Sequence, residues 1–273
     1  MQDQIGTSFP ANDSGLTYLC KRNKMLVKSQ VKYIQSLGQK KFRDPEGVFV
    51  AEGPKLVSEL LMSPHLPLVT LYAVKDWLEI NRERLATLSS HQIVEVRNSE
   101  LERISFLATP NQVLAVFRQP SFTGLPLKQG SGISLLLDNI QDPGNLGTIV
   151  RIADWFGLRC VVCSPDSADV FNAKAVQSTM GSIGRVQVSY EDPAAYIDRQ
   201  KGLPVYATAL GGTSIYTMER ISRGIIVIGN ESKGIRESLL SRIPHHITIP
   251  RIGEAESLNA AVATGIVLSH LAL

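Results

Sequence analysis

Short apolar runs alternate with amphipathic stretches along most of the chain. Val31, Ile34 and Leu37 recur at the spacing of one helix face, whereas the next apolar runs are short and rich in β-branched residues, which is typical of strands. This alternation predicts an α/β fold. In the first half we expect a helix through residues 31–37, strands at 48–51, 68–74, 93–96 and 112–117, and helices at 54–62, 76–88 (capped by Asp76) and 99–107.

The second half has longer apolar runs, which predict strands buried on both faces. Five buried strands with helices between them indicate a largely parallel sheet covered by helices on both sides. Strands are expected at 133–137, 158–163, 205–209, 224–228 and 247–249, with a short one at 186–188, and helices at 145–156, 172–179, 193–200, 235–241 and 258–273.

The last of these helices is the most apolar. Ser257 precedes an alanine-rich run with almost no charge, so we expect Ser257 to cap a helix that is buried on most sides. Pro250 closes the strand before it, because proline has no N–H to donate to a sheet. Chain termini normally lie at the surface, so a buried terminal helix requires other segments to wrap around it.

The chain has room for two domains in its 273 residues. Residues 1–24 are polar without periodicity and are interpreted as a disordered tail or an extension. Residues 25–118 form the first α/β unit, and residues 119–132, rich in proline and glycine, form a linker. Residues 133–273 form the second domain.

The composition, 44% hydrophobic and 19% charged, is ordinary for a soluble globular protein. A net charge of +3 permits a nucleic-acid partner without demanding one. No apolar run is suited to span a bilayer, and no signal peptide stands at the start. Three cysteines are too few for a disulfide framework, so we expect a reducing, cytoplasmic location and no membrane.

Metal binding is not expected. Cys160 and Cys163 have C-x-x-C spacing, but on a strand an offset of three sends the two thiols to opposite faces, which argues against a metal or redox site. The five histidines form no ligand-spaced cluster with cysteines or acids.

Basic residues without intervening acids dominate the start of the first domain. Such a run is either a solvated helix face or a surface that contacts RNA phosphates. The candidate RNA-binding residues are Lys28, Lys32, Lys40, Lys41 and Arg43.

Three polar motifs stand at or near the ends of predicted strands in the second domain. They are DNIQDPGNLGTIVR at 138–151, IVIGNESKG at 226–234 and ITIPRIGEAESLNAAVATGIVL at 247–268. In this order and spacing they resemble the motifs of the SpoU (TrmH) family of RNA ribose 2′-O-methyltransferases, in the SPOUT superfamily. The resemblance covers about residues 132–273.

The resemblance implies a SPOUT α/β-knot, in which the C-terminal segment passes through an earlier loop to make a deep trefoil knot. It also implies a homodimer that binds S-adenosyl-L-methionine. The sequence FVAEG at 49–53, after the basic helix, resembles the small RNA-binding domain that often precedes a SpoU module and selects the substrate. The alternative for this first domain is a generic α/β unit used for dimer contacts.

By resemblance, the catalytic residues are Asn145, Arg151, Glu231, Ser257 and Asn259. In the family the arginine contacts the RNA phosphate and is a proposed activator of the 2′-OH. Because arginine stays protonated in ordinary surroundings, positioning is favoured over proton abstraction. The candidate cofactor-binding residues, read mainly through their backbone, are Thr208, Ala209, Leu210, Gly229, Ile249 and Leu258.

The expected activity is transfer of a methyl group to a ribose 2′-OH of RNA. Ribosomal RNA is favoured over transfer RNA, a preference that depends on the first domain alone. A non-catalytic RNA-binding module of the same fold is the alternative from another class, and five intact polar site residues argue against it. An oxidoreductase is not supported, because no G-x-G-x-x-G opens a helix after a strand.

Overall fold

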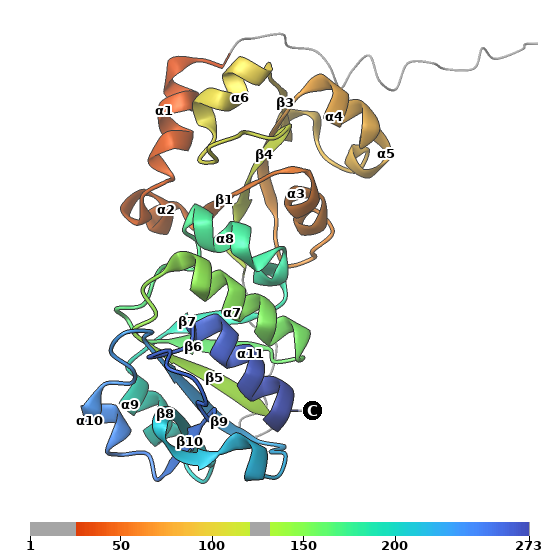
Figure 1. The fold of residues 1–273 in the computed structure, drawn as a ribbon. Coiled ribbons are helices and arrows are strands. Elements are labelled where there is room, and N and C mark those ends of the chain that lie inside the picture. Colours follow the sequence, from red (N-terminus) through yellow and green to blue (C-terminus); the bar gives the residue numbers. More distant parts are fainter. Residues whose placement is uncertain (1–25, 121–131, 273) are drawn as a thin grey trace, which may run out of the picture.

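The computed structural model describes residues 26–120 and 132–272, which form two α/β domains joined end to end (Figure 1). The tail expected over residues 1–24 and most of the linker expected over 119–132 lie outside the described residues. Gln119 still belongs to the first domain, since its N–H donates to the carbonyl of Gly47 at 2.8 Å.

The N-terminal domain is built on a four-stranded sheet in the order β1-β4-β2-β3. Strand β4 pairs antiparallel with β1 and β2, and β2 pairs parallel with β3. The elements are α1 (Lys28–Ser36), α2 (Lys40–Glu46), β1 (Val48–Glu52), α3 (Pro54–Leu60), β2 (Leu68–Ala73), α4 (Lys75–Ile80), α5 (Arg82–Leu85), η1 (Ser90–Gln92), β3 (Ile93–Glu95), α6 (Asn98–Ile104) and β4 (Val113–Arg118).

Helices cover both faces of this sheet, because successive side chains of its strands point to opposite faces and are apolar on both. Val48 and Val50 of β1 pack with α1 and α6, whereas Phe49 and Ala51 pack with α3 on the other face. In α1 the predicted periodicity is confirmed, since Val31 and Ile34 are buried.

The single helix expected at 76–88 is wrong. Two helices, α4 and α5, meet at Asn81, whose side-chain amide donates back to the carbonyl of Trp77 at 2.9 Å. The backbone of Asn81 leaves the helical conformation (φ −101°, ψ 14°), and this ends the first helix. The N-cap is Val74, not Asp76, and Asp76 instead occupies the first turn, where a carboxylate is favoured by the helix dipole.

The C-terminal domain has a six-stranded sheet in the order β10-β8-β9-β5-β6-β7, and every pairing in it is parallel. The prediction of a parallel sheet is therefore confirmed. The elements are β5 (Ile133–Asp138), α7 (Pro143–Trp155), β6 (Cys160–Cys163), α8 (Ala173–Thr179), η2 (Ser182–Gly184), β7 (Gln187–Tyr190), α9 (Pro193–Arg199), β8 (Val205–Ser214), η3 (Ile215–Thr217), β9 (Gly224–Gly229), α10 (Glu237–Leu240), β10 (His245–Thr248) and α11 (Ala260–Leu271).

Helices α7 and α11 cover one face of this sheet, and α9 and α10 cover the other. The two faces separate Cys163, which packs with α7 and α11, from Cys160, which packs with α9 and α10. This confirms that the thiols point to opposite faces. Burial raises the pKa of the Cys160 thiol to about 11 and raises that of Cys163 as well, so both thiols are protonated at neutral pH.

One prediction about the terminal helix is wrong. Ser257 does not cap it: the helix begins two residues later, and the side-chain oxygen of Asn259 accepts from the N–H groups of Ala261 and Val262. Asparagine two positions closer to the first turn reaches both donors. The helix is buried on most sides, as expected, and its exposed residues, Val262 and Ser269, lie seven positions apart on one face.

A stability comparison tests this assignment of the cap. Replacing Asn259 with alanine should lower the free energy of unfolding by about 1 kcal/mol, because two helix N–H groups lose their acceptor. Replacing Ser257 with alanine should leave it unchanged within about 0.5 kcal/mol. Urea unfolding of the two variants measures both values, and equal losses would contradict the assignment.

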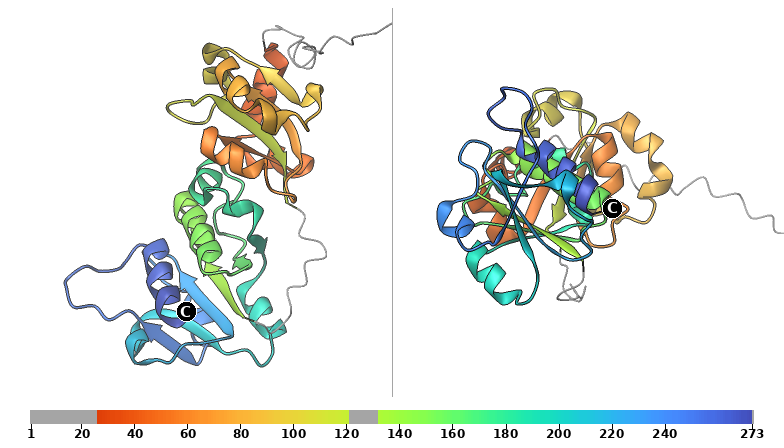
Figure 2. Two further views of the ribbon diagram at one scale, coloured as in Figure 1. Left: turned by 90° about the vertical axis from the view of Figure 1, so that its right-hand side faces the viewer. Right: turned by 60° about the horizontal axis from the view of Figure 1, so that its bottom comes forward.

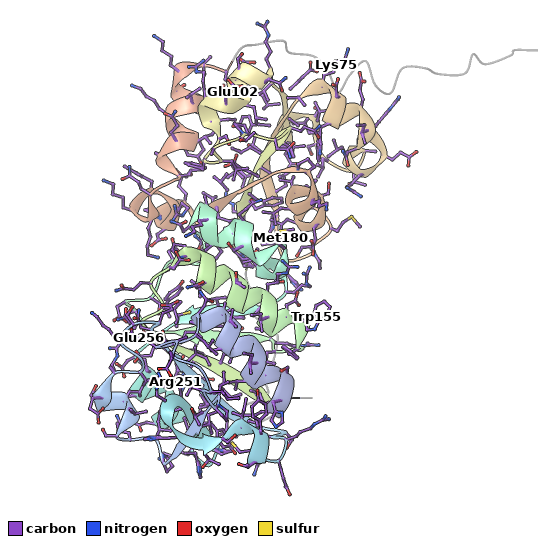
Figure 3. All side chains as sticks on the ribbon, in the orientation of Figure 1. Lys75, Glu102, Trp155, Met180, Arg251 and Glu256 are labelled. Carbon is purple, nitrogen blue, oxygen red and sulfur yellow. The ribbon has the colours of Figure 1, made fainter. Side chains whose placement is uncertain are left out.

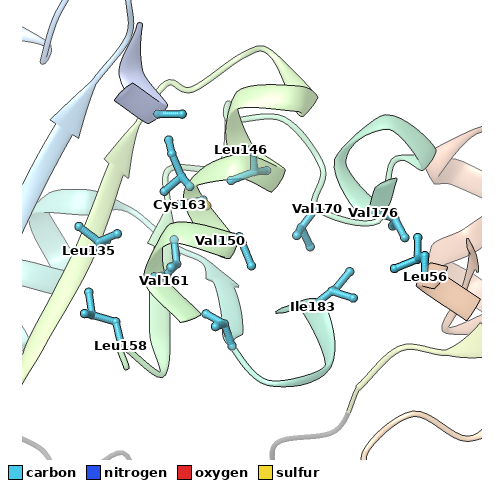
Figure 4. Packing of buried hydrophobic residues seen from close by; sticks show 14 of the residues in the cluster. Leu56, Leu135, Leu146, Val150, Leu158, Val161, Cys163, Val170, Val176 and Ile183 are labelled. Carbon is cyan, nitrogen blue, oxygen red and sulfur yellow. The ribbon is translucent and has the colours of Figure 1, made fainter. Parts of the chain in front are cut away.

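The two domains share one hydrophobic core. Leu56 of α3 packs near Val176 of α8 and Ile183 of η2, and this cluster continues into the core beneath α7 (Figure 4). The view turned by 90° in Figure 2 shows α8 lying at the junction between the domains. The N-terminal domain is therefore docked on the C-terminal domain.

Arg43 lies in this junction, so the expectation that it contacts RNA is wrong. Its side chain is 2% exposed, donates to the carbonyl of Leu37 at 2.6 Å, and pairs with Asp169 of the other domain at 2.5 Å. A guanidinium buried with a carboxylate partner is unavailable to a phosphate.

Candidate active site

Three polar residues from three separate motifs meet at the carboxyl edge of the parallel sheet. The side-chain amide of Asn145 donates to Glu231 at 2.5 Å, and the amide of Asn259 donates to the side-chain oxygen of Asn145 at 2.9 Å. We call Glu231, Asn145 and Asn259 the polar triad. All three belong to the predicted catalytic set, and the structure brings them together although 86 and 114 positions separate Asn145 from its two partners.

The hydrogen bonds of the triad run in one direction, from Asn259 through Asn145 to Glu231. The oxygen of Asn259 is occupied by two helix N–H groups, so its nitrogen must face Asn145. Asn145 then accepts through its oxygen and donates through its nitrogen to Glu231. Glu231 acts as an acceptor, as an ionised carboxylate does. The capping of α11 therefore sets the orientation of both amides.

Asn145 owes its position to the start of α7. Asp142 caps this helix by accepting from the backbone N–H of Asn145 at 2.8 Å, and Pro143 occupies the first helical position. Lys174 of α8 pairs with Asp142 at 2.6 Å, and its hydrogen bond is the main cause that lowers the pKa of the Asp142 carboxyl. Sequence reasoning missed Lys174, because only the fold brings it to this cap.

Close packing of α7 on α8 depends on Gly147. A Cβ atom there would stand 2.2 Å from the carbonyl oxygen of Ala175, so any larger residue would push the two helices apart. This contact explains a glycine inside a helix, where it is otherwise unfavourable.

Arg151 and Ser257 do not join the triad. Arg151 is exposed on α7, six positions after Asn145, and within the described residues its side chain makes no hydrogen bond or ion pair. A surface salt bridge of Arg151 is therefore absent from the part of the chain that the structure describes. Ser257 lies exposed in the loop before α11. The roles expected of both stay predictions.

The candidate cofactor residues lie along three neighbouring strands. Thr208 and Ala209 lie in β8, Gly229 ends β9, and Ile249 directly follows β10. In open parallel sheets, ligands bind outside the carboxyl ends of strands. The remaining two residues, Leu210 and Leu258, have exposed side chains near this edge.

Four of the five basic candidates are exposed on α1 and α2, namely Lys28, Lys32, Lys40 and Lys41. The ammonium of Lys40 lies 5.9 Å from the ring of Tyr190, the last residue of β7. Helix α2 thus lies beside the same carboxyl edge that carries the polar triad. Sequence reasoning missed Phe42, which directly follows the two lysines and is exposed, with the ammonium of Lys41 4.9 Å from its ring.

An apolar face lies open on α7 and α11, which pack side by side in the C-terminal domain (Figure 1). Trp155 of α7 is 84% exposed and projects from the molecule (Figure 3), and Val262 of α11 and Leu258 just before it are also exposed. Exposed apolar side chains on two neighbouring helices, a tryptophan among them, mark a surface suited to a protein partner.

Within residues 26–120 and 132–272, no group of three or more His, Cys, Asp or Glu side chains is arranged to hold a metal ion. In the same residues, no helix has the length and apolarity needed to cross a membrane.

Fold and site together define a two-domain α/β protein whose polar centre lies at the edge of a parallel sheet, next to a basic helix of the docked domain. The SpoU rRNA Methylase family model matches residues 132–269, and the MRM3-like substrate binding domain model matches residues 28–115. The chain belongs to the SpoU rRNA methylase family.

Relatives and solved structures agree with this assignment. The chain is 34% identical to the 23S rRNA (guanosine(2553)-2′-O)-methyltransferase RlmP of Bacillus subtilis (strain 168), over 89% of this chain and 95% of that protein. A TrmH-family structure from Porphyromonas gingivalis has a TM-score of 0.76 at 39% identity, covering 90% of this chain and 98% of that one. The AdoMet-bound rRNA methyltransferase from Sinorhizobium meliloti has a TM-score of 0.77 at 31% identity, covering 90% and 94%.

Proposed function

We propose that this protein transfers a methyl group from S-adenosyl-L-methionine to a ribose 2′-OH of ribosomal RNA. The observation that carries the proposal is the polar triad, which unites the three family motifs at one edge of the sheet. Family membership gives the reaction class. RlmP, which is similar over nearly its whole length, is named for 2′-O-methylation of 23S rRNA.

The residues at this edge fit the cofactor. When bound, S-adenosylmethionine would supply an electrophilic methyl group on a positively charged sulfur: transfer to the 2′-oxygen would break the methyl–sulfur bond, leave neutral S-adenosylhomocysteine and release the hydroxyl proton to solvent. The Glu231 carboxylate favours a cation and disfavours a phosphate at this place. Backbone groups near Thr208, Gly229 and Ile249 would hold the adenosine. Thr208 directly follows the part of β8 that pairs with β9, Gly229 ends β9, and Ile249 follows β10.

The chain's own residues then orient the acceptor. Asn145, fixed by Glu231 and Asn259, offers an amide beside the 2′-OH at a constant angle. Arg151 holds the neighbouring phosphate, for which an unpaired guanidinium is suited. Since a guanidinium stays protonated, we assign Arg151 to positioning and not to proton abstraction.

We further propose a homodimer that buries the open face of α7 and α11. The exposed side chains of Trp155 and Val262 would become buried from water in this interface. Arg151 lies one turn before Trp155 on α7, so pairing through this face would bring it toward the partner's site. Sedimentation should give twice the mass of the chain, and Trp155→Lys should give the monomer.

Two other parts of the proposal follow from family membership. The first is a trefoil knot, in which α11 enters through an earlier loop. The second is a cytoplasmic location, because the proposed substrate is ribosomal RNA.

The lysines of α1 and α2 are proposed to contact the RNA backbone. Replacing Lys40 and Lys41 together with alanine should weaken RNA binding and reduce the slope of log K against log salt by about 1.5, since each lost phosphate contact removes roughly 0.7–0.9. Filter binding at several salt concentrations measures the slope.

A matched pair of lysines provides the control. Lys55 of α3 and Lys75 of α4 are exposed in the same domain but on its other side (Figure 1). Replacing both with alanine makes the same change of charge and should leave the slope within 0.3 or so of the wild-type value. Equal effects of the two double variants would contradict a specific contact at α2.

Methyl transfer from labelled S-adenosylmethionine to separated ribosomal and transfer RNA tests the substrate. Label in ribosomal RNA is expected. Label confined to transfer RNA would mean that the proposed reaction is right and the proposed substrate is wrong. Binding of RNA without methyl transfer to either class would favour the non-catalytic RNA-binding module.

A further inference from the structure

The loop that carries Glu231 is tied to the carboxyl end of β5 on both of its sides. Before Glu231, the side-chain amide of Asn230 donates to the carbonyl of Asn139 at 2.9 Å. After it, the backbone N–H of Arg236 donates to Asp138 Oδ2 at 2.8 Å. The two anchors are the last residue of β5 and the residue after it, and they begin the motif that contains Asn145.

Between these anchors the loop is a closed turn. Asn230 and Gly234 exchange backbone hydrogen bonds at 3.1 and 2.9 Å, and the Asn230 side-chain oxygen accepts from the N–H groups of Ser232 and Lys233. Gly229 lies against the far side of the turn, where a Cβ atom would stand 2.3 Å from the carbonyl carbon of Gly234. A turn closed in this way moves as one piece, so its anchors decide where Glu231 points.

Asp138 is an unusual anchor because it is a buried charge. Its side chain is 1% exposed, and its Oδ1 lies 2.6 Å from Nη2 of Arg236. This contact is a close ion pair, and the backbone N–H of Arg236 adds a hydrogen bond to the other carboxylate oxygen. A buried carboxylate without its cation is costly, so Asp138 holds Arg236 firmly.

Asp166, in the loop after β6, is the outer partner of the same arginine. Its two oxygens lie 3.0 and 3.1 Å from Nη2 of Arg236, and its side chain is 49% exposed. Ion pairs between exposed side chains contribute little to the stability of a fold. Asp138 is therefore the partner that fixes Arg236.

We propose that Asp138 and Arg236 are positioning residues for Glu231: they hold its loop at the orientation in which the carboxylate reaches Asn145. The inference rests on the proposed methyl transfer. Neither residue touches the triad directly, and their effect passes through the closed turn. A misplacement of about 1 Å at a reacting centre costs roughly 100-fold in rate.

Two variants test the proposal. Asp138→Asn keeps the shape of the side chain and removes its charge. Arg236→Gln changes a half-exposed side chain, so this variant should fold even if Asp138→Asn does not. Each should lower kcat at least tenfold or so with KM for RNA unchanged. Asp166→Asn and Arg242→Gln, which breaks an exposed bidentate pair with Asp198, are matched controls that should stay within about twofold.

A double-mutant cycle separates positioning from simple destabilisation. If Asp138 and Arg236 act through Glu231, adding Arg236→Gln to Glu231→Gln should cause little further loss of kcat. Arg236→Lys, which restores the charge, should recover part of the rate. Fully additive losses, or a wild-type kcat in both Asp138→Asn and Arg236→Gln, would overturn the inference. Absence of transfer by the wild-type protein, or a silent Glu231→Gln, would instead count against the proposed function.

Discussion

Replacing Asn145 with alanine should reduce methyl transfer roughly 100-fold or more, the effect of removing one preorganised donor at a reacting centre. Asn145 is the middle member of the polar triad, so its loss leaves the Glu231 carboxylate without its donor and the Asn259 amide without its acceptor. The backbone contact with the Asp142 cap survives the change, and α7 should still form. Single-turnover transfer with saturating cofactor measures the rate.

The control for this variant is another asparagine. Asn172 caps α8 by accepting from the Lys174 N–H at 2.9 Å and lies outside the triad. Its replacement with alanine makes the same chemical change and costs about 1 kcal/mol of stability. Transfer by Asn172→Ala should stay close to wild type. A rate for Asn145→Ala within twofold of wild type would remove the triad from the mechanism.

Arg151→Ala should also lower transfer by orders of magnitude, while binding of S-adenosylmethionine is retained. Arg151 makes no hydrogen bond or ion pair within the described residues, so its removal costs the folded chain little. The loss would come from the phosphate that it holds. Transfer rates and equilibrium dialysis of the cofactor separate the two effects, and Arg159→Ala, at another exposed arginine of this domain, is the control.

Mixing subunits shows which site Arg151 serves. If it acts across the dimer, a heterodimer of Arg151→Ala and Asn145→Ala has one site with both residues intact, and activity should return on mixing. If it acts within its own chain, both sites of the heterodimer stay defective. Restored activity supports the proposed interface, and its absence in proven heterodimers contradicts the action in trans.

The residues of the triad could be predicted because they stand in three motifs that resemble those of the SpoU family. Asn145, Glu231 and Asn259 each lie in one of these motifs, and in a parallel sheet the carboxyl ends of the strands meet at one edge. The order of strands and helices was predictable because local periodicity determines it.

Features that depend on distant partners could not be predicted. Arg43 has the same local context as Lys40 and Lys41, yet Asp169, 126 positions away, draws it into the domain junction. Asp138 and Arg236 are 98 positions apart, and nothing near either residue indicates the other. The N-cap of α11 was predicted wrongly for another reason. Ser257 and Asn259 are both favourable N-cap residues, and only the path of the loop determines which of them caps the helix.

The most direct test of the central claim is nucleoside analysis after transfer. Ribosomal RNA is incubated with the wild-type protein and labelled S-adenosylmethionine, digested to nucleosides and separated by mass. We predict that the label appears in a 2′-O-methylnucleoside, and that Asn145→Ala removes it. Label on a base nitrogen or carbon would contradict ribose methylation.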